Sequence, residues 1–209
     1  MSELNTIYRL NKEDIAKGAQ VLYRAFSEDP FWEKVFNGES DVENKRLAFF
    51  EMPLRQGLYY GEAYAPSKDL EGIGVLMPND KINMTLSMTI RCGALKAGRI
   101  MGMSMGRKLT RLFKSLEEDH KTNMGKRDYL YLSILGVDSD QQGKGYGGAL
   151  LRSFIETSSK REMPLYLETE TEENVQFYEK FGFKVIKKMV LPFVEHPLWE
   201  MVREPDKSK

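Results

Sequence analysis

The segment from Asp138 to Leu151, DSDQQGKGYGGALL, holds four glycines in fourteen residues. Gly143, Gly145 and Gly148 have the spacing GxGxxG. Backbone N–H groups freed of side chains, at the positive end of a helix, form a binding site for phosphate groups. The segment lies between the strand-like run YLYLSILGV and a stretch of apolar residues at helical spacing. It therefore predicts a phosphate-binding turn that joins a strand to a helix.

Several nucleotide-binding patterns nearly fit these glycines. Glu168 follows Gly148 by about 20 residues, as the dinucleotide fingerprint requires. However, DSDQQ separates Val137 from the first glycine, and the residues after Gly148 are too few to complete a doubly wound sheet. The Walker pattern fails because Ala149 and Leu150 stand where a lysine and a hydroxyl are needed.

The pattern QxxGxG is the third candidate. In it, the backbone amides of the loop bind a diphosphate, and Lys144 adds a direct charge contact. A glycine-rich helix start that only permits close packing also explains the glycines, so the neighbouring residues must decide. The candidate cofactor-binding residues of the loop are Gln142, Gly143, Lys144, Gly145, Tyr146, Gly147 and Gly148.

The surrounding sequence resembles the GCN5-related N-acetyltransferase (GNAT) family. The match combines YLSILGVDSDQQGKGYGGALL, LYLETETEENVQFYEKFGFKV and the element NxxxYxxxGF, roughly over residues 129–185. The last element is met by Asn174, Tyr178, Gly182 and Phe183. YLxxLGVD, NVxFYExxGF, the closing LPFVEHPLWEMVRE and the early AFSEDPFW are similar to the branch that contains puromycin N-acetyltransferase. Many relatives carry a histidine at the start of the YL strand, where this chain has Tyr129, so no role is carried over for it.

The resemblance implies an α/β (α+β) fold of the GNAT acyl-CoA N-acyltransferase type. Its mixed, mostly antiparallel sheet is flanked by helices and has splayed central strands. It also implies acetyl-CoA as the donor and CoA as the product. The strand that carries Leu135, Gly136 and Val137 would separate from the YLET strand. Leu135 and Val137 would then offer unpaired backbone groups to the pantetheine arm.

Tyr178 is the predicted general acid of this chemistry. A phenol with a pKa of about 10 keeps its proton at neutral pH and can give it to the departing thiolate. The alternative is that Tyr178 packs a short helix and only hydrogen-bonds the sulfur of the cofactor. Asn174, one turn earlier, would bind the pantetheine or cap the helix.

Glu168, at the end of the YLET strand, is the predicted general base. An alkyl ammonium with a pKa of about 10.4 is almost fully protonated at pH 7, so a group must remove its proton before attack. The alternative is that Glu168 pairs with a cationic substrate or a neighbouring lysine. Glu28, Asp29 and Tyr131 are further candidates for binding the amine, although solvation of a surface loop also explains the two acids.

The segment from Asn83 to Lys121 is rich in methionine and basic residues. Its glycines interrupt helical spacing, so we expect two or more short helices. Methionines there could line an adaptable wall over the acceptor site, the cations could form a membrane-binding patch, and core packing with solvated charges is the third explanation. The methionines concerned are Met84, Met88, Met101, Met103 and Met105.

The remaining sequence supplies elements around the candidate site. Asn11 and Asp14 resemble a cap before a helix that ends near Pro30, and Asp41 opens a second helical stretch that Pro53 is expected to kink or divide. EAYAP and GIGVLMP predict a hairpin, EENVQFYEKF a short helix that Gly182 terminates, and FKVIKKMVL and LWEMVRE two closing strands.

The expected organisation is a single domain over residues 1–209. We divide it into N-terminal helices and a hairpin over 1–80, a helical Met-rich insertion over 81–125, and the acetyl-CoA-binding core over 126–205.

Composition limits the partners. Thirty-one basic and thirty-one acidic residues cancel, so no global field favours nucleic acid or a membrane. One cysteine and two histidines make a disulfide framework or a metal site improbable. The first residues lack the pattern of a secretion signal, and no apolar run is long enough for a membrane span. We expect a cytoplasmic protein that binds no metal and can form a homodimer.

The predicted function is acetyl transfer from acetyl-CoA to a primary amine, of a small molecule or a peptide, by direct attack in a ternary complex. One alternative is a non-catalytic acyl-CoA sensor. The other is a dinucleotide-dependent oxidoreductase.

Overall fold

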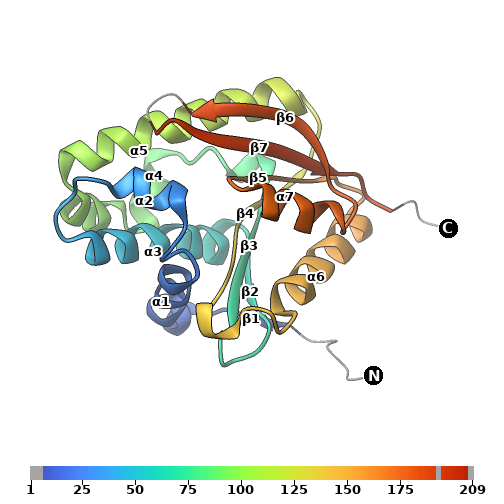
Figure 1. Cartoon of the computed structure of the whole chain (residues 1–209), viewed down its shortest axis with the longest axis horizontal. Helices are drawn as coiled ribbons and strands as arrows, with labels where there is room; N and C mark the ends of the chain where they lie inside the picture. Colours follow the sequence, from blue (N-terminus) through green and yellow to red (C-terminus); the bar gives the residue numbers. More distant parts are fainter. Residues whose placement is uncertain (1–6, 192–193, 207–209) are drawn as a thin grey trace.

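A computed structural model describes residues 7–191 and 194–206 of the chain. Its described strands form one seven-stranded sheet in the order β1-β2-β3-β4-β5-β7-β6 (Figure 1). All neighbouring strands pair antiparallel except β4 and β5, which are parallel. The strands are β1 (Tyr8–Arg9), β2 (Glu62–Ala65), β3 (Gly72–Pro78), β4 (Leu130–Val137), β5 (Leu165–Thr169), β6 (Lys184–Leu191) and β7 (His196–Arg203). The mixed, mostly antiparallel sheet that the sequence predicts is confirmed.

The two central strands separate soon after they begin. β4 and β5 pair only at Leu130 with Leu165 and at Tyr131 with Tyr166. Beyond Tyr131, β4 continues alone on this side, while its other edge stays paired with β3 as far as Val137. The predicted splay of the central strands is therefore present.

Helices cover both faces of the sheet (Figure 1). Gly74 and Gly136 mark the two faces where helices approach most closely, because a Cβ on Gly74 would meet Phe154 at 2.5 Å and one on Gly136 would meet Phe26 at 2.9 Å. Phe154 belongs to α6, and Phe26 directly follows α1. The helices are α1 (Ile15–Ala25), α2 (Pro30–Phe36), α3 (Val42–Tyr60), α4 (Leu86–Arg91), α5 (Ala94–Met124), α6 (Tyr146–Lys160) and α7 (Glu172–Glu179), with 3₁₀ turns at Lys12–Asp14, Asn79–Lys81 and Ser139–Gln141.

Local signals set several helix boundaries. Asn11 and Asp14 form a capping box, as their spacing predicts. α1 ends at Ala25, before Pro30. Pro30 occupies the first turn of α2, where its missing N–H costs nothing. The sequence did not predict this short helix. The expectation that Pro53 divides the next helix is wrong, because α3 runs through it without interruption.

The Met-rich segment forms α4 and the long α5, and α5 is broken at Gly102, whose φ of 72° is not helical. Met101 and Met105 lie in the core, whereas Met103 is 81% exposed. For the first two, core packing is therefore the explanation that holds. No helix in the described ranges is long and apolar enough to cross a bilayer.

Candidate active site

The gap between β4 and β5 is lined by backbone groups of β4. Asp138 donates its N–H to Glu71 O (2.9 Å), which fixes the alternation of hydrogen bonds between β4 and β3. Gly136 consequently faces β3, and the N–H and C=O groups of Leu135 and Val137 face the gap. No pairing with β5 reaches these two residues among the described strands. They are the two residues that the sequence predicts as backbone partners of pantetheine.

Gly136 serves the site by letting a helix approach. Its missing side chain is replaced by Leu22 and Phe26, which a Cβ would meet at 3.0 and 2.9 Å. α1 thus closes over β4 directly beside the gap.

The glycine loop ends at the N-terminus of α6. Gly143 (φ 75°) and Gly145 (φ 85°) adopt the left-handed conformation that favours glycine, and a Cβ on either would meet nothing within 4 Å. Gly145 is the N-cap residue, and no side chain caps the helix. The first-turn amides of Tyr146, Gly147 and Gly148 have no acceptor within an α-helix. They form an open set of donors at the positive end of the helix dipole.

The polar side chains of the loop are bonded to the loop itself. Gln142 donates to Val137 O (3.3 Å), and Lys144 donates to Asp140 O (3.1 Å) and Gln141 Oε1 (2.8 Å). Lys144 must leave these acceptors to make the predicted contact with a phosphate.

Asp138 is neutralised by α1. Arg24 binds its carboxylate through two nitrogens, with a shortest distance of 2.6 Å. This hydrogen bond holds the pKa of Asp138 below its usual value. The negative charge next to the loop is therefore matched, and the loop is tied to the helix that covers β4.

Tyr178 lies on α7, packed edge-on against Phe183 with ring centroids 5.5 Å apart. It is 8% exposed, and its hydroxyl has no hydrogen-bond partner among the described residues. Burial, with the charge of Glu170, raises the pKa of Tyr178 above its usual 10.0. The phenol therefore keeps its proton at neutral pH, as a general acid must.

Asn174 does not cap α7. Thr171 is the N-cap residue, and its side chain accepts the N–H of Asn174 at 3.2 Å. Of the two predicted roles of the Asn174 side chain, helix capping is wrong, and contact with pantetheine stays a prediction.

Glu168 is held by a histidine from α5. Nε2 of His120 and Oε1 of Glu168 form an ion pair in which the side chains are only 7% and 6% exposed. Burial acts to lower the pKa of His120, but the charge and hydrogen bond of Glu168, with the charges of Glu200 and Asp119, raise it above 6.5. The contact with Glu168 therefore favours the protonated form of His120.

Three tyrosines surround this pair. The His120 ring meets Tyr131 and Tyr166 edge-on, with centroids 4.9 and 4.6 Å away, and the Tyr129 hydroxyl lies 3.4 Å from His120 Nδ1. Burial and the charge of Glu168 raise the pKa of Tyr129 to about 12 and that of Tyr131 well above 10.0. Tyr131, predicted to bind the amine, thus lies beside the predicted base.

A second carboxyl group, that of Glu170, directly follows β5. Glu170 has a pKa raised to about 8 by burial and by the charges of Asp29 and Glu168. Asp29 comes from the loop before α2, where its carboxylate accepts the N–H groups of Phe31 and Trp32 at 3.0 and 3.2 Å. Burial raises the pKa of Asp29 as well. Glu28, its predicted companion, is exposed.

His120 and Glu170 were not among the predicted site residues. His120 is 48 residues from Glu168 in the chain, and no local pattern links them. Glu170 had a usable signal, because residues i and i+2 of a strand lie on one face and Glu168 was already a candidate.

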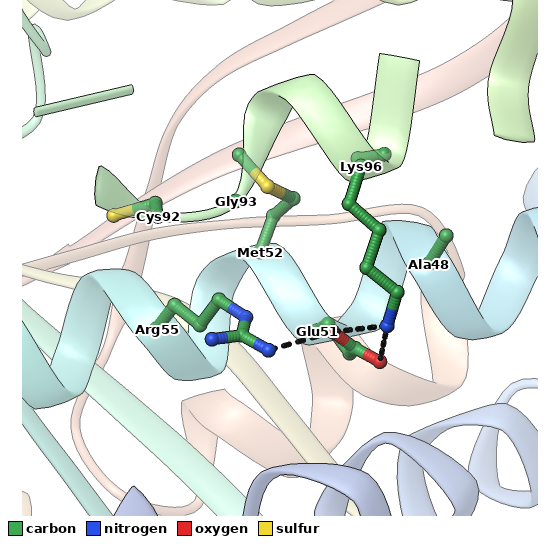
Figure 2. A pocket seen from close by; sticks show the side chains of 8 residues that line it. Ala48, Glu51, Met52, Arg55, Cys92, Gly93 and Lys96 are labelled. Atoms are coloured by element: carbon green, nitrogen blue, oxygen red, sulfur yellow. Dashed lines mark hydrogen bonds and ion pairs between the residues drawn. The ribbon is translucent and has the colours of Figure 1, made fainter. Parts of the chain in front are cut away.

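A surface hollow elsewhere has no predicted site residue. It lies between α3 and the start of α5 and is lined by Ala48, Glu51, Met52, Arg55, Cys92, Gly93, Lys96 and Ala97. Figure 2 shows the Glu51 carboxylate engaged by both Arg55 (3.0 Å) and Lys96 (3.1 Å). The one carboxylate among the described residues of the hollow is thus already paired with both of its cations.

Comparison with known proteins agrees with this geometry. Residues 97–185 match the model of the acetyltransferase (GNAT) domain. An uncharacterized N-acetyltransferase of Schizosaccharomyces pombe is 27% identical over 206 residues, which cover 95% of this chain and 83% of the relative.

Solved structures share the fold. A histone acetyltransferase HPA2 and related acetyltransferase from Corynebacterium glutamicum superposes with a TM-score of 0.64 at 18% identity, covering 98% of each chain. A polyamine N-acetyltransferase of Drosophila melanogaster superposes with a TM-score of 0.61 at 12% identity, covering 95% of this chain and 99% of that one. The similarity to the puromycin N-acetyltransferase branch stays a prediction. The domain match and the similarity over 95% of the chain support an acetyltransferase of the GNAT type, and the solved structures share its fold.

Proposed function

We propose that this protein transfers an acetyl group from acetyl-CoA to a primary amine, by direct attack in a ternary complex. The observation that carries the proposal is the unpaired edge of β4, which leads to the uncapped N-terminus of α6. This arrangement offers backbone donors and acceptors to an extended ligand that ends in a diphosphate.

The chain fits acetyl-CoA at this place. Leu135 and Val137 would bind the pantetheine amides as an added strand does. The amides of residues 143–148 would bind the diphosphate, where the lack of side chains at Gly143 and Gly145 leaves room. Asn174 and Lys144 have exposed side chains that can add contacts. When bound, acetyl-CoA supplies the activated acetyl thioester.

Two side chains would handle the protons. Glu168 would take one proton from the ammonium of the acceptor, so that the nitrogen has a free electron pair. Tyr178 would give one proton to the sulfur as the bond between carbon and sulfur breaks. As the new bond between nitrogen and carbon forms and the thiol leaves, the nitrogen loses a second proton, which restores Tyr178. Glu168 gives its proton to solvent, so two protons leave the nitrogen, one reaches the sulfur and one is released.

The acceptor end is acidic. Asp29, Glu168 and Glu170 bring three carboxyl groups to the end of β5, and His120 provides one matching charge there. Burial and the charges of Asp29 and Glu168 raise the pKa of Glu170 to about 8, and a bound cation would favour its ionised form. We infer that the acceptor is an amine that arrives protonated, with Glu28 and Tyr131 at the edge of its site.

A thiol-release screen tests the proposal. Purified protein is incubated with acetyl-CoA and a panel of aliphatic, aromatic and peptide amines, and free CoA is measured over time. Steady release that depends on one class of amine is expected. Tight binding of acetyl-CoA with no release for any amine would indicate a sensor instead. Thermal stabilisation by NAD but not by CoA would indicate a dinucleotide enzyme.

A further inference from the structure

We propose that His120, from the Met-rich insertion, is a positioning residue that binds the Glu168 carboxylate and orients it toward the acceptor amine. The inference rests on the proposed function, in which Glu168 accepts a proton. It assigns a task to a histidine that lies 48 residues from its partner in the chain.

Both ring nitrogens of His120 are engaged, which decides its task. Nε2 meets Glu168 Oε1, and Nδ1 lies 3.4 Å from the Tyr129 hydroxyl. No nitrogen is left to receive a proton from a substrate. Glu168, in contrast, has one oxygen occupied by the histidine and a second oxygen, Oε2, that can face the amine. The carboxylate is therefore the acceptor, and the histidine acts through it.

Burial makes this support necessary. A carboxylate that is 6% exposed, surrounded by aromatic rings, has little water to stabilise its charge, so an opposite charge must lie nearby. The imidazolium supplies the missing charge, at a position that α5 fixes.

The charges that face His120 come from every element around it. Tyr131 lies on β4 and Tyr129 directly before it, and β5 contributes Tyr166 and Glu168. Glu200 of β7 accepts a hydrogen bond from Asn123, one turn further along α5. Lys187 of β6 pairs with Asp119 of α5 at 2.5 Å. Asp119 is thus already matched, and Glu168 is the acid that contacts the ring.

The first test is the pH profile of kcat/KM for His120→Gln, which keeps an N–H donor and removes the charge. The acidic limb of this profile should move to higher pH, because the positive charge beside the proposed proton acceptor is gone. Asn123→Ala is the matched control, because it also removes a hydrogen bond from α5 to a buried carboxylate. It should leave that limb in place. A limb that does not move in His120→Gln, in an enzyme that still transfers acetyl groups, would overturn the proposal.

The second test needs no activity. The chain has only two histidines, so NMR titration of their ring protons is simple to assign with His196→Gln. The pKa of His120 should be lower in Glu168→Gln than in the parent protein, because the charge and hydrogen bond of Glu168 that raise it are gone. Equal values in both proteins would refute the pairing. If no amine supports turnover, the proposed function fails, and this measurement still decides the pairing.

Discussion

The two faces of the central sheet are built in different ways. On the face that carries α6 and α7, the candidate site is made of backbone groups and one tyrosine, all within residues 130–183. On the opposite face, it is made of charged side chains from α5, the loop before α2 and β5, which lie far apart in the sequence. The proposed acetyl-CoA site is therefore made of residues that are close in the sequence, whereas the proposed proton acceptor is positioned by residues that only folding brings together.

The largest expected effect concerns Tyr178, on the face of the sheet that carries α6 and α7. Tyr178→Phe removes the proposed acid while keeping the packing of its ring against Phe183. We expect kcat to fall by about 10²- to 10⁴-fold, with little change in acetyl-CoA affinity, because the hydroxyl acts on the leaving group. Stopped-flow kinetics and calorimetry measure the two quantities. Tyr64→Phe, which removes a hydroxyl on β2, is the control. Parent-like rates for Tyr178→Phe at every pH would remove Tyr178 from the mechanism.

The next prediction concerns the face of the sheet where the charged side chains lie. Glu168→Gln should lower kcat/KM by about 10²-fold or more, because the acceptor keeps its proton. Glu51→Gln is a matched control, since Glu51 is also a carboxylate paired with cations, Arg55 and Lys96, but lies in the hollow of Figure 2. It should change stability and leave turnover unchanged. Similar losses in both variants would mean that Glu168 has no special role.

A smaller effect contrasts two glycines that both have open space for a methyl group. Gly145→Ala forces a side chain onto a residue with φ of 85° and should cost about 1 to 2 kcal/mol, with weaker acetyl-CoA binding. Gly98→Ala lies in α5 with nothing within 4 Å and should stabilise the helix by about 0.5 to 1 kcal/mol. Urea unfolding and calorimetry measure both. An equal gain in stability from both would contradict the strained loop.

The smallest effect concerns the ion pair that joins α1 to the loop. Arg24 is 43% exposed, so Arg24→Gln should cost at most about 1 kcal/mol at pH 7. Because Arg24 lowers the pKa of Asp138 below 3.8, this stabilisation exists above about pH 4 and is lost as the pH falls through the lowered pKa. Urea unfolding at pH 7 and near pH 2.5 should show the difference shrinking. A constant difference would exclude the pair as its source.

The same contrast explains what the sequence could predict. The glycine loop, α6, β5 and α7 follow one another, so their spacing and caps predict both the elements and the donor site. Asn11 and Asp14 likewise form their cap from residues three apart. In each case the decisive interactions are short in sequence.

The contacts of α5 could not be predicted in this way. Gly93 and Gly102 predict several short helices, and α5 is indeed broken at Gly102, yet its second part runs on to Met124 with Met105 and Leu112 buried in the core. Its last turns then place His120 against Glu168. That contact depends on the length and direction of a whole helix, which no local pattern encodes.

The crystal structure of this protein with acetyl-CoA tests the central claim most directly. We predict that the diphosphate binds the amides of residues 143–148. The pantetheine arm should lie along Leu135 and Val137, in the gap between β4 and β5. A ligand bound elsewhere, or a gap closed by pairing of β4 with β5 beyond Tyr131, would contradict it.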